Sequence, residues 1–352
     1  MKNDQETWKR YNNRMGDQKI KKMKIVLVGS SPAMLLQALI LAKKNNNVQV
    51  FEKKNRLGGS WKTSDFYNIK NIETGTHIFA PWKNAKLYFQ SKKFLETKLK
   101  LKTFFLKPQP VRIINKHITR KELAKIKYFY IRGGANQLIK NLISLIKKKK
   151  IKIFFNKKIK KVLVDSRGKK RLILCDKSSI EADKIYLPLF LDLTNFYYSK
   201  KKRYVTIFKS KVSKHLVIEL LNKKIRFKRK LTYIQKANFS KFIDRVCKFN
   251  FKNKTIYCLR LSEIAKRGLK ESKKKQIHLI YKDLLNFLFQ KKYDGKKINF
   301  RAKIYTYNSS YRNIENVVKL KTFTKLLGLN LIDTSEIIKY ISQNIKQLND
   351  SL

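Results

Sequence analysis

The sequence predicts an α/β fold that combines a parallel sheet with a second, mainly β, part. Two observations support this prediction. An apolar strand at 25–29 (IVLVG), a helix at 33–44 and a strand at 48–52 (VQVFE) follow one another closely, which is the pattern of a βαβ unit. In the region 200–300, stretches such as HLVIELL and TIYCLRL alternate as strands do, and a helix is expected at 275–290.

The other elements are predicted in chain order. Residues 64–90 have the pattern of loops and short strands, and 91–128 that of mixed helix and extended chain, with a break at Pro108 and Pro110. A Gly-Gly turn then precedes an apolar-periodic helix at 137–147. Further strands are expected at 151–155, 159–164, 172–175 and 185–188, and a final helix is expected with Thr334 or Ser335 as its N-cap.

Length and composition fit a folded protein, because 43% of the 352 residues are hydrophobic. The three cysteines are too few and too scattered for a disulfide framework, and the four histidines lack the spacing of a metal site, so no metal is expected. No apolar run indicates a transmembrane helix, and 1–22 form a polar tail without a signal-peptide core. A cytoplasmic protein that starts at Met1 or Met23 is therefore expected.

The formal net charge of +62 is the most unusual property of the composition. It would suit nucleic-acid binding, since lysines that neutralise phosphates release counterions. The lysines, however, are spread from Lys2 to Lys346 and far outnumber the arginines, whereas a nucleic-acid-reading surface concentrates its charge and favours arginine. We therefore expect solvated lysines on every face and no specific nucleic-acid partner, with an anionic small-molecule substrate or a membrane-surface patch left open.

A dinucleotide-binding fingerprint that lacks two of its glycines follows the first strand. In such a fingerprint the first glycine makes the tight turn, the second lets backbone approach the diphosphate, and the third lets helix and strand pack closely. Gly29 keeps the first place, but Ser31 stands at the second and Met34 at the third. The Ser31 hydroxyl can donate a hydrogen bond in compensation, whereas Met34 is expected to push the helix away from the strand.

Two neighbouring features support an anion site despite the missing glycines. Ser31 and Pro32 are expected to form the N-cap and first position of the helix, whose N–H groups and positive dipole end would face outward. Glu52 ends the second strand, where a carboxylate can accept a hydrogen bond from a ribose hydroxyl. The alternative for Glu52, a solvated residue at a strand end, stays open.

The continuation EKKNRLGGSW, from Glu52 to Trp61, shows the pattern E-x3-R-x-G-G-x-W. Together with GSSPA, with GTHIF at 75–79 and with YIRGGANQLIKNL from Tyr130, it resembles the superfamily of FAD-dependent flavoproteins that includes amine oxidases, protoporphyrinogen oxidases, carotene desaturases and UDP-galactopyranose mutases. GTHIF is similar to the mutases' G-x-H-I-F in particular. Each piece alone is weak, so the combination carries the resemblance.

The resemblance implies a discontinuous, Rossmann-like FAD-binding domain at 23–90, 128–199 and 301–352, with an inserted, mainly β substrate domain at 91–127 and 200–300. It also implies which residues hold FAD. Gly29, Ser31 and Ala33 would lie by the diphosphate, Glu52 on the adenosine ribose, and Arg56, Gly58, Gly59 and Ser60 along the diphosphate and ribityl chain. Ile159 would hold the adenine through its backbone, and Gly75, Thr76 and His77 would lie near the isoalloxazine, with His77 the candidate catalytic residue. Pro32 and Lys53 are further cofactor-binding candidates.

The implied function is that of an FAD-dependent oxidoreductase that transfers a hydride from an unidentified small molecule to the flavin. Two alternatives stay open: a mutase-like flavoenzyme acting on a sugar nucleotide in surface-polysaccharide synthesis, and a degenerate, non-catalytic member that serves as a binding protein. The last is suggested by departures from the family pattern, which put FAD retention in question. These are Ser31, Met34, Ala80 where the mutases have a second histidine, and the segment 301–352, where Gly328 and Asp333 are the nearest candidates for the family's usual cofactor grip.

Overall fold

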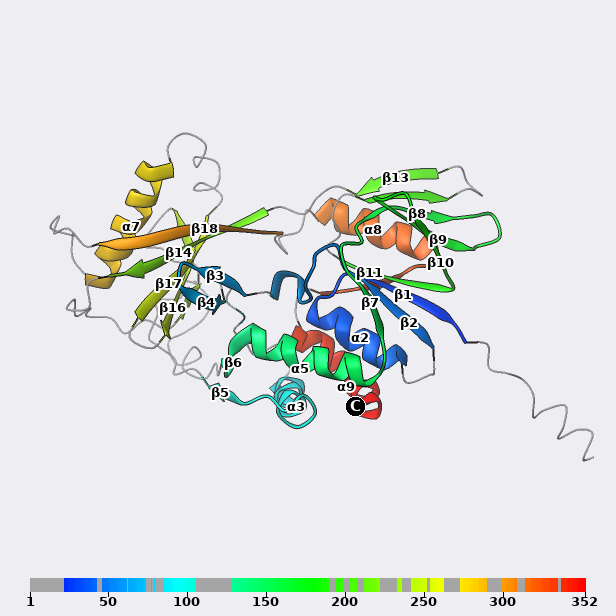
Figure 1. The fold of residues 1–352 in the computed structure, drawn as a ribbon, viewed down its shortest axis with the longest axis horizontal. Helices are drawn as coiled ribbons and strands as arrows, with labels where there is room; N and C mark the ends of the chain where they lie inside the picture. Colours follow the sequence, from blue (N-terminus) through cyan, green and yellow to red (C-terminus); the bar gives the residue numbers. More distant parts are fainter. Residues whose placement is uncertain are drawn as a thin grey trace, which may run out of the picture.

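The fold contains three five-stranded sheets and two two-stranded sheets within the described residues (Figure 1). The computed structural model describes residues 22–42, 46–61, 63–73, 77, 79, 85–105, 128–189, 194–198, 203–207, 212–221, 233–235, 242–251, 254–262, 273–289, 299–308, 314–334 and 337–352.

The first sheet is parallel and is built around the first predicted strand. Its order is β19 (Asn330–Ile332), β11 (Lys184–Pro188), β1 (Lys24–Val28), β2 (Asn47–Phe51) and β7 (Lys152–Phe154). The chain continues from β1 to β2 on one side, whereas β11 lies on the other side, so the strand order reverses at β1. In open α/β sheets the carboxyl ends of the strands at such a reversal form the ligand crevice.

Side chains of β1 alternate between the two faces of this sheet, and each face has its own core. Ile25 and Leu27 belong to the core on the helical face, whereas Val26 and Val28 belong to the core shared with the second sheet. A parallel sheet covered on both faces explains the continuous apolar run IVLVG. The helices on the first face are α2 (Pro32–Ala42), α3 (Ala85–Thr97), α5 (Gly134–Lys148) and α9 (Ile337–Ser351), while α8 (Ile314–Leu326) lies on the other (Figure 1).

The second sheet packs on the parallel sheet through side chains such as Val162, Leu172 and Phe196, all of which are fully buried. Its neighbouring strands are antiparallel except for the pair β12 and β8, which is parallel. Its order is β10 (Ser179–Ala182), β9 (Lys170–Leu174), β8 (Ile159–Val164), β12 (Thr194–Tyr198) and β13 (Arg203–Ile207).

The third sheet is antiparallel and lies at the other end of the molecule (Figure 1). One face is covered by α7 (Lys273–Phe289), and the other meets the hairpin of β3 (Ser64–Phe66) and β4 (Ile69–Ile72). The Tyr305 hydroxyl donates to the Asp65 carbonyl at 2.6 Å, which ties this hairpin to the sheet. The sheet order is β15 (Tyr233–Gln235), β16 (Ile243–Phe251), β17 (Lys254–Leu261), β14 (Val212–Leu220) and β18 (Phe300–Asn308).

The structure confirms the α/β fold class, the opening βαβ unit, the helix predicted at 275–290 and the helical end of the chain. A further short antiparallel pair joins β5 (Thr103–Phe105) to β6 (Phe129–Ile131). Among the described residues, no helix has both the length and the apolar character that a membrane crossing requires.

Two elements differ from the domain boundaries expected from the sequence. Helix α3 crosses the boundary at 90/91, and its Phe94 and Leu95 join the core around α2, because this face of the helix packs against α9. Strand β18 crosses the boundary at 300/301 and pairs with β14 along its whole length, so it belongs to the third sheet. The expected substrate-domain segment 106–127 lies outside the described residues.

Candidate functional site

The turn after β1 is the point where the sequence predicts a diphosphate site. Gly29 has a φ of +85°, which favours glycine, and its N–H donates to the Phe51 carbonyl at 2.8 Å. Helix α2 begins at Pro32, and the Ser31 carbonyl accepts a hydrogen bond from the Leu35 N–H at 3.0 Å. The predicted start of this helix is therefore confirmed.

The Ser31 side chain does not cap the helix, contrary to the sequence prediction. Its Oγ is buried and makes no hydrogen bond within the described part of the chain. An N-cap serine would accept a hydrogen bond from an N–H of the first turn. The first turn of α2 therefore combines an unpartnered hydroxyl with N–H groups that the Ser31 side chain does not occupy, and both suit an anion.

Met34, which stands at the position of the third fingerprint glycine, packs in the hydrophobic core. Met34 is fully buried and belongs to the same hydrophobic core as Ile25 and Leu27 of β1. Its side chain thus contributes to the interface between helix and sheet, where a glycine would let the two approach more closely.

Glu52 follows β2 and is only 3% exposed, so it is not the solvated strand-end residue of the alternative interpretation. Its Oε2 accepts hydrogen bonds from the Ser30 hydroxyl at 2.6 Å and the Ser30 N–H at 3.1 Å, and its Oε1 accepts one from the Lys54 N–H at 3.0 Å. Each carboxylate oxygen has two lone pairs. Oε1 therefore keeps the capacity to accept a ribose hydroxyl while Oε2 anchors the turn after β1.

The loop after Glu52 folds back onto the turn after β1. The Gly58 N–H lies 3.0 Å from the Ser30 carbonyl and 3.2 Å from the Ser30 hydroxyl, and donates to both. Gly58 and Gly59 have φ of +107° and +57°, which side chains rarely adopt. A Cβ on Gly59 would lie 3.5 Å from the Ser31 Cα, which shows how closely the two loops approach. The motif G-G-x-W thus forms the second wall of the predicted diphosphate site.

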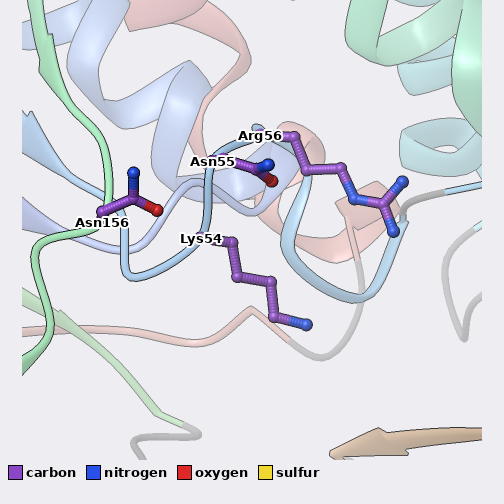
Figure 2. Close-up of a pocket in the computed structure, with 4 residues that line it drawn as sticks. All are labelled: Lys54, Asn55, Arg56 and Asn156. Atoms are coloured by element: carbon purple, nitrogen blue, oxygen red, sulfur yellow. The ribbon is translucent and has the colours of Figure 1, made fainter.

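A surface pocket of about 680 Å³ lies beside this loop. It is lined by Lys54, Asn55 and Arg56 from the loop and by Asn156 from the chain after β7 (Figure 2). The Arg56 guanidinium donates to the Thr63 carbonyl at 3.3 Å. Two cationic side chains at one pocket favour an anionic ligand.

The remaining predicted cofactor residues differ in their exposure, and some of them lie outside the described residues. Lys53 is an exposed loop residue, Ser60 lies in the short 3-10 turn Gly59–Trp61, and Ala33 is buried in the first turn of α2. Ile159 is buried at the start of β8, opposite Leu174. Gly75 and Thr76 lie outside the described residues, so His77 alone is described among the three residues predicted near the isoalloxazine.

A buried carboxylate that sequence reasoning missed lies next to His77. Glu73 follows β4 and is 4% exposed. Its Oε1 accepts the His77 N–H at 2.8 Å and lies 2.6 Å from His77 Nδ1. Its Oε2 accepts the Tyr130 hydroxyl and, at 3.1 Å, the Ala135 N–H in the first turn of α5. Glu73 therefore joins GTHIF to the motif that begins at Tyr130.

The protonation states of this cluster follow from its contacts. Burial raises the pKa of a carboxyl, but His77 and the hydrogen bonds from His77, Tyr130 and Ala135 outweigh burial and hold the pKa of Glu73 below its ordinary value. Burial and the Glu73 charge raise the pKa of Tyr130, so the phenol keeps its proton and donates. Burial and the neighbouring Cys247 and Glu73 raise the pKa of Cys258, whose thiol lies 3.6 Å from the Glu73 carbonyl.

Trp61 connects the two halves of the candidate site. Its ring stacks on the His77 ring with centroids 4.1 Å apart and an interplanar angle of 24°. Trp61 ends the G-G-x-W motif and its N–H donates to the Gly58 carbonyl at 2.9 Å. The loop from Glu52 to Trp61 and the Glu73 cluster are therefore adjacent parts of one candidate site.

The site residues fit a dinucleotide that carries a diphosphate. The carboxyl ends of β1 and β2 and the first turn of α2 meet where the strand order reverses, and the orphaned Ser31 hydroxyl lies there. Asp333 follows β19 at the same edge of the sheet and lies 3.6 Å from the Lys339 ammonium. The C-terminal segment thus reaches this edge as well, although it lacks the expected glycines.

Comparisons with known proteins agree with this architecture. Residues 27–91 match the family described as NAD(P)-binding Rossmann-like domain. No curated protein matches the sequence significantly.

Several solved structures match over most of both chains. An oxidoreductase from Methanosarcina mazei is 13% identical, with a TM-score of 0.53 over 82% of this chain and 89% of its own. A protein from Exiguobacterium sp. 255-15, assigned as a protoporphyrinogen oxidase, is 11% identical, with a TM-score of 0.57 over 94% and 99%. Putrescine oxidase bound to putrescine is 12% identical, with a TM-score of 0.57 over 94% and 98%.

These likenesses define the fold. The chain has a Rossmann-like domain within a mixed α/β architecture, and the resemblance to the amine-oxidase-like flavoproteins is confirmed at the level of fold.

Proposed function

We propose that this protein is an FAD-dependent oxidoreductase of the amine-oxidase-like class, which oxidises a small molecule next to the Trp61–His77 pair. FAD, when bound, would supply the two-electron acceptor. The protein would supply the FAD-binding site. Gly29 and the first turn of α2 would hold the diphosphate, Glu52 Oε1 would bind the ribose, and the loop through Gly58 and Gly59 would form the opposite wall.

One observation carries the proposal. Within the described residues the buried Ser31 hydroxyl has no hydrogen-bond partner, and it lies at the start of α2, at the edge where open α/β sheets generally bind ligands. A buried hydroxyl without a partner is costly, so its retention points to a bound acceptor. The likeness to putrescine oxidase and to the Methanosarcina oxidoreductase supports redox chemistry at this crevice.

The absorbance spectrum of the purified protein tests the cofactor. We expect a yellow preparation with flavin absorbance, or uptake of added FAD by a colourless one, followed through the quenching of FAD fluorescence. A colourless protein that takes up no FAD would overturn the proposal and leave the non-catalytic binding protein as the remaining interpretation.

Two serine variants make the test specific to the proposed diphosphate site. Ser31→Ala removes the orphaned hydroxyl and should weaken FAD binding by roughly tenfold, the effect of losing one hydrogen bond to a charged group. Ser178→Ala is the matched control, because the Ser178 hydroxyl donates to Asp176 at an exposed turn and should leave FAD affinity unchanged. Equal affinity in both variants would place the diphosphate elsewhere.

The type of reaction is tested separately from cofactor binding. The FAD-reduced protein is incubated under anaerobic conditions with UDP-galactopyranose, the probe for the mutase-like alternative. We expect no isomerisation of the sugar. Turnover without net oxidation of the flavin would instead identify a sugar-nucleotide mutase.

A further inference from the structure

The Glu73 carboxylate is surrounded by donors from three segments of the chain. His77 donates from its own loop, Tyr130 from β6, and the Ala135 N–H from the first turn of α5. A buried carboxylate without such partners would cost several kcal/mol and would take up a proton. Donors from the three segments together keep the buried Glu73 carboxylate charged.

Helix α5 is shaped to accept this carboxylate. Its N-cap residue is Gly133, which has no side chain to cap the helix, and Gly134 follows with a φ of +62°. A Cβ on Gly134 would overlap the Glu73 Oε2 and lie 2.5 Å from the Tyr130 hydroxyl oxygen. Glu73 therefore takes the place of a capping side chain, and the positive end of the helix dipole stabilises its charge. The Gly-Gly pair leaves the space that the carboxylate fills.

The contacts of Glu73 determine the protonation of the His77 ring. An ionised carboxylate only accepts hydrogen bonds, so the His77 Nδ1, 2.6 Å from Oε1, must carry the proton. The backbone N–H of His77 donates to the same oxygen, and the stacked Trp61 ring fixes the plane of the imidazole. In the neutral ring the lone pair is then on Nε2, which makes no hydrogen bond within the described part of the chain.

We propose that Glu73 is a positioning residue that fixes His77 in the Nδ1–H form and thereby makes Nε2 the proton acceptor of the candidate site. This inference rests on the proposed function. For a substrate with a C–H bond beside an O–H or N–H group, the carbon's hydrogen leaves with its bonding pair as hydride to the flavin. The heteroatom's proton goes to Nε2, and a C=O or C=N bond forms.

The Glu73 charge also accounts for what happens after proton transfer. The imidazolium formed on His77 is paired with a carboxylate at 2.6 Å, which stabilises it as the transfer proceeds. Among the described residues, the other titratable groups that face Glu73 are Tyr130 and Cys258, and burial raises the pKa of both, so neither competes for the proton near neutral pH. The proton-accepting position is therefore Nε2 alone within this cluster.

Nuclear magnetic resonance of the full-length protein with 15N-labelled histidine rings tests the inference. His77→Asn assigns the His77 signals among the four histidines. In the neutral ring we expect a protonated Nδ1 and a bare Nε2. A protonated Nε2 with a bare Nδ1 would contradict the inference. The measurement does not require bound FAD, and the absorbance spectrum of the same sample reports separately on the proposed function.

Two variants separate positioning from folding. Glu73→Gln should abolish the preference for the Nδ1–H form, because an amide can donate to Nδ1 as well as accept from it. Tyr130→Phe removes a partner of Oε2 only and should keep the preference for the Nδ1–H form. If Glu73→Gln fails to fold, the test rests on the wild type and Tyr130→Phe, both of which should show the Nδ1–H form. If His77 keeps its protonated Nδ1 and bare Nε2 in folded Glu73→Gln, Glu73 does not determine the protonation of the ring.

Chemical modification tests Nε2 as the reactive atom. Diethyl pyrocarbonate attacks an imidazole nitrogen that bears a lone pair, and mass spectrometry locates the product. We expect modification of His77 in the FAD-free protein and a several-fold slower reaction after FAD is added. A His77 that stays unmodified in the FAD-free protein would show that Nε2 is not available to accept a proton.

Discussion

Two buried carboxylates, Glu52 and Glu73, hold the candidate site together in different ways. Both follow a strand, and both are almost completely buried, at 3% and 4% exposure. The partners of Glu52 come from its own loop and from the turn after β1, through Ser30 and Lys54. The partners of Glu73 come from its own loop, from β6 and from α5.

This difference in partners suits Glu52 to ligand binding and Glu73 to the positioning of His77. Among the described residues, one carboxylate oxygen of Glu52 has a single protein donor, which leaves room for the ribose hydroxyl of the proposed cofactor. Glu73 has two donors on each oxygen and faces a histidine, so its effect on a substrate acts through that histidine. Changes near Glu73 should therefore affect the stability of the protein most, and changes near Glu52 should affect ligand binding most.

The largest expected effect comes from Gly134→Ala. The new Cβ would overlap Glu73 Oε2 at a backbone conformation that side chains rarely adopt, which should lower the free energy of unfolding by about 4 kcal/mol. Gly168→Ala is the matched control, since Gly168 has a φ of +80° with no atom near the new Cβ, and should cost only about 1 kcal/mol. Urea unfolding measures both. Equal losses would mean that Glu73 does not fill the space at the start of α5.

Glu73→Gln should lower the free energy of unfolding by about 3 kcal/mol, because an amide cannot accept all the donors that surround a buried carboxylate. Glu181→Gln provides the control. Its carboxylate pairs with Arg171 at 2.6 Å on the surface, and such pairs contribute less than about 1 kcal/mol. If both variants lose the same stability, the donors around Glu73 do not stabilise its charge.

The two carboxylates also differ in how far the sequence predicted them. Glu52 could be found because a strand and a glycine motif flank it, and spacing along the chain was enough. Two partners of Glu73, Tyr130 and Ala135, are distant in sequence, and only the fold brings them to the carboxylate. The available signal was the Gly-Gly pair at the start of α5, which indicates a close approach to a helix start that lacks a capping side chain.

Some predictions about the fold failed for a related reason. Spacing predicted the helix that begins at Pro32, but it could not show that the Ser31 hydroxyl would make no hydrogen bond to the helix N–H groups. Strand β18 was divided between two domains because its partner β14 lies far away in the chain. Local periodicity predicts elements well, whereas pairing depends on contacts that periodicity does not contain.

Acidification should reduce the difference between wild type and Glu73→Gln. The pKa of Glu73 in the folded state lies below its ordinary value of 4.5, so the unfolded state binds the proton first. Its contribution is fully present above the unfolded pKa and is lost as pH falls through the folded pKa. Urea unfolding at several pH values should show a constant difference near neutral pH and a shrinking one below about pH 4.

The comparison with the variant isolates Glu73 from other carboxyls. Asp65, Glu96 and Asp176 also have lowered pKa values, that of Asp176 reaching about 2, and they titrate equally in both proteins. A difference that stays constant across the acidic range would show that Glu73 has the same pKa in the folded and unfolded states.

The smallest effects are expected at the two neighbouring serines, where they should differ in kind. Ser30→Ala removes a hydroxyl that donates to Glu52 at 2.6 Å and accepts the Gly58 N–H at 3.2 Å, and should cost about 1.5 kcal/mol of unfolding free energy. Ser31→Ala removes a hydroxyl that has no hydrogen-bond partner among the described residues, and should leave the FAD-free protein within about 0.5 kcal/mol of wild type.

Addition of FAD should stabilise the two serine variants to different extents. A ligand stabilises the folded state by an amount that rises with the logarithm of its affinity, so the increase in unfolding midpoint on adding FAD reports on the proposed diphosphate site. Ser31→Ala should gain less from FAD than the wild type, because its missing hydroxyl would bind the diphosphate. Ser30→Ala keeps that hydroxyl and should gain more than Ser31→Ala, and the opposite order would place the ligand against Ser30 and Glu52 Oε2 instead.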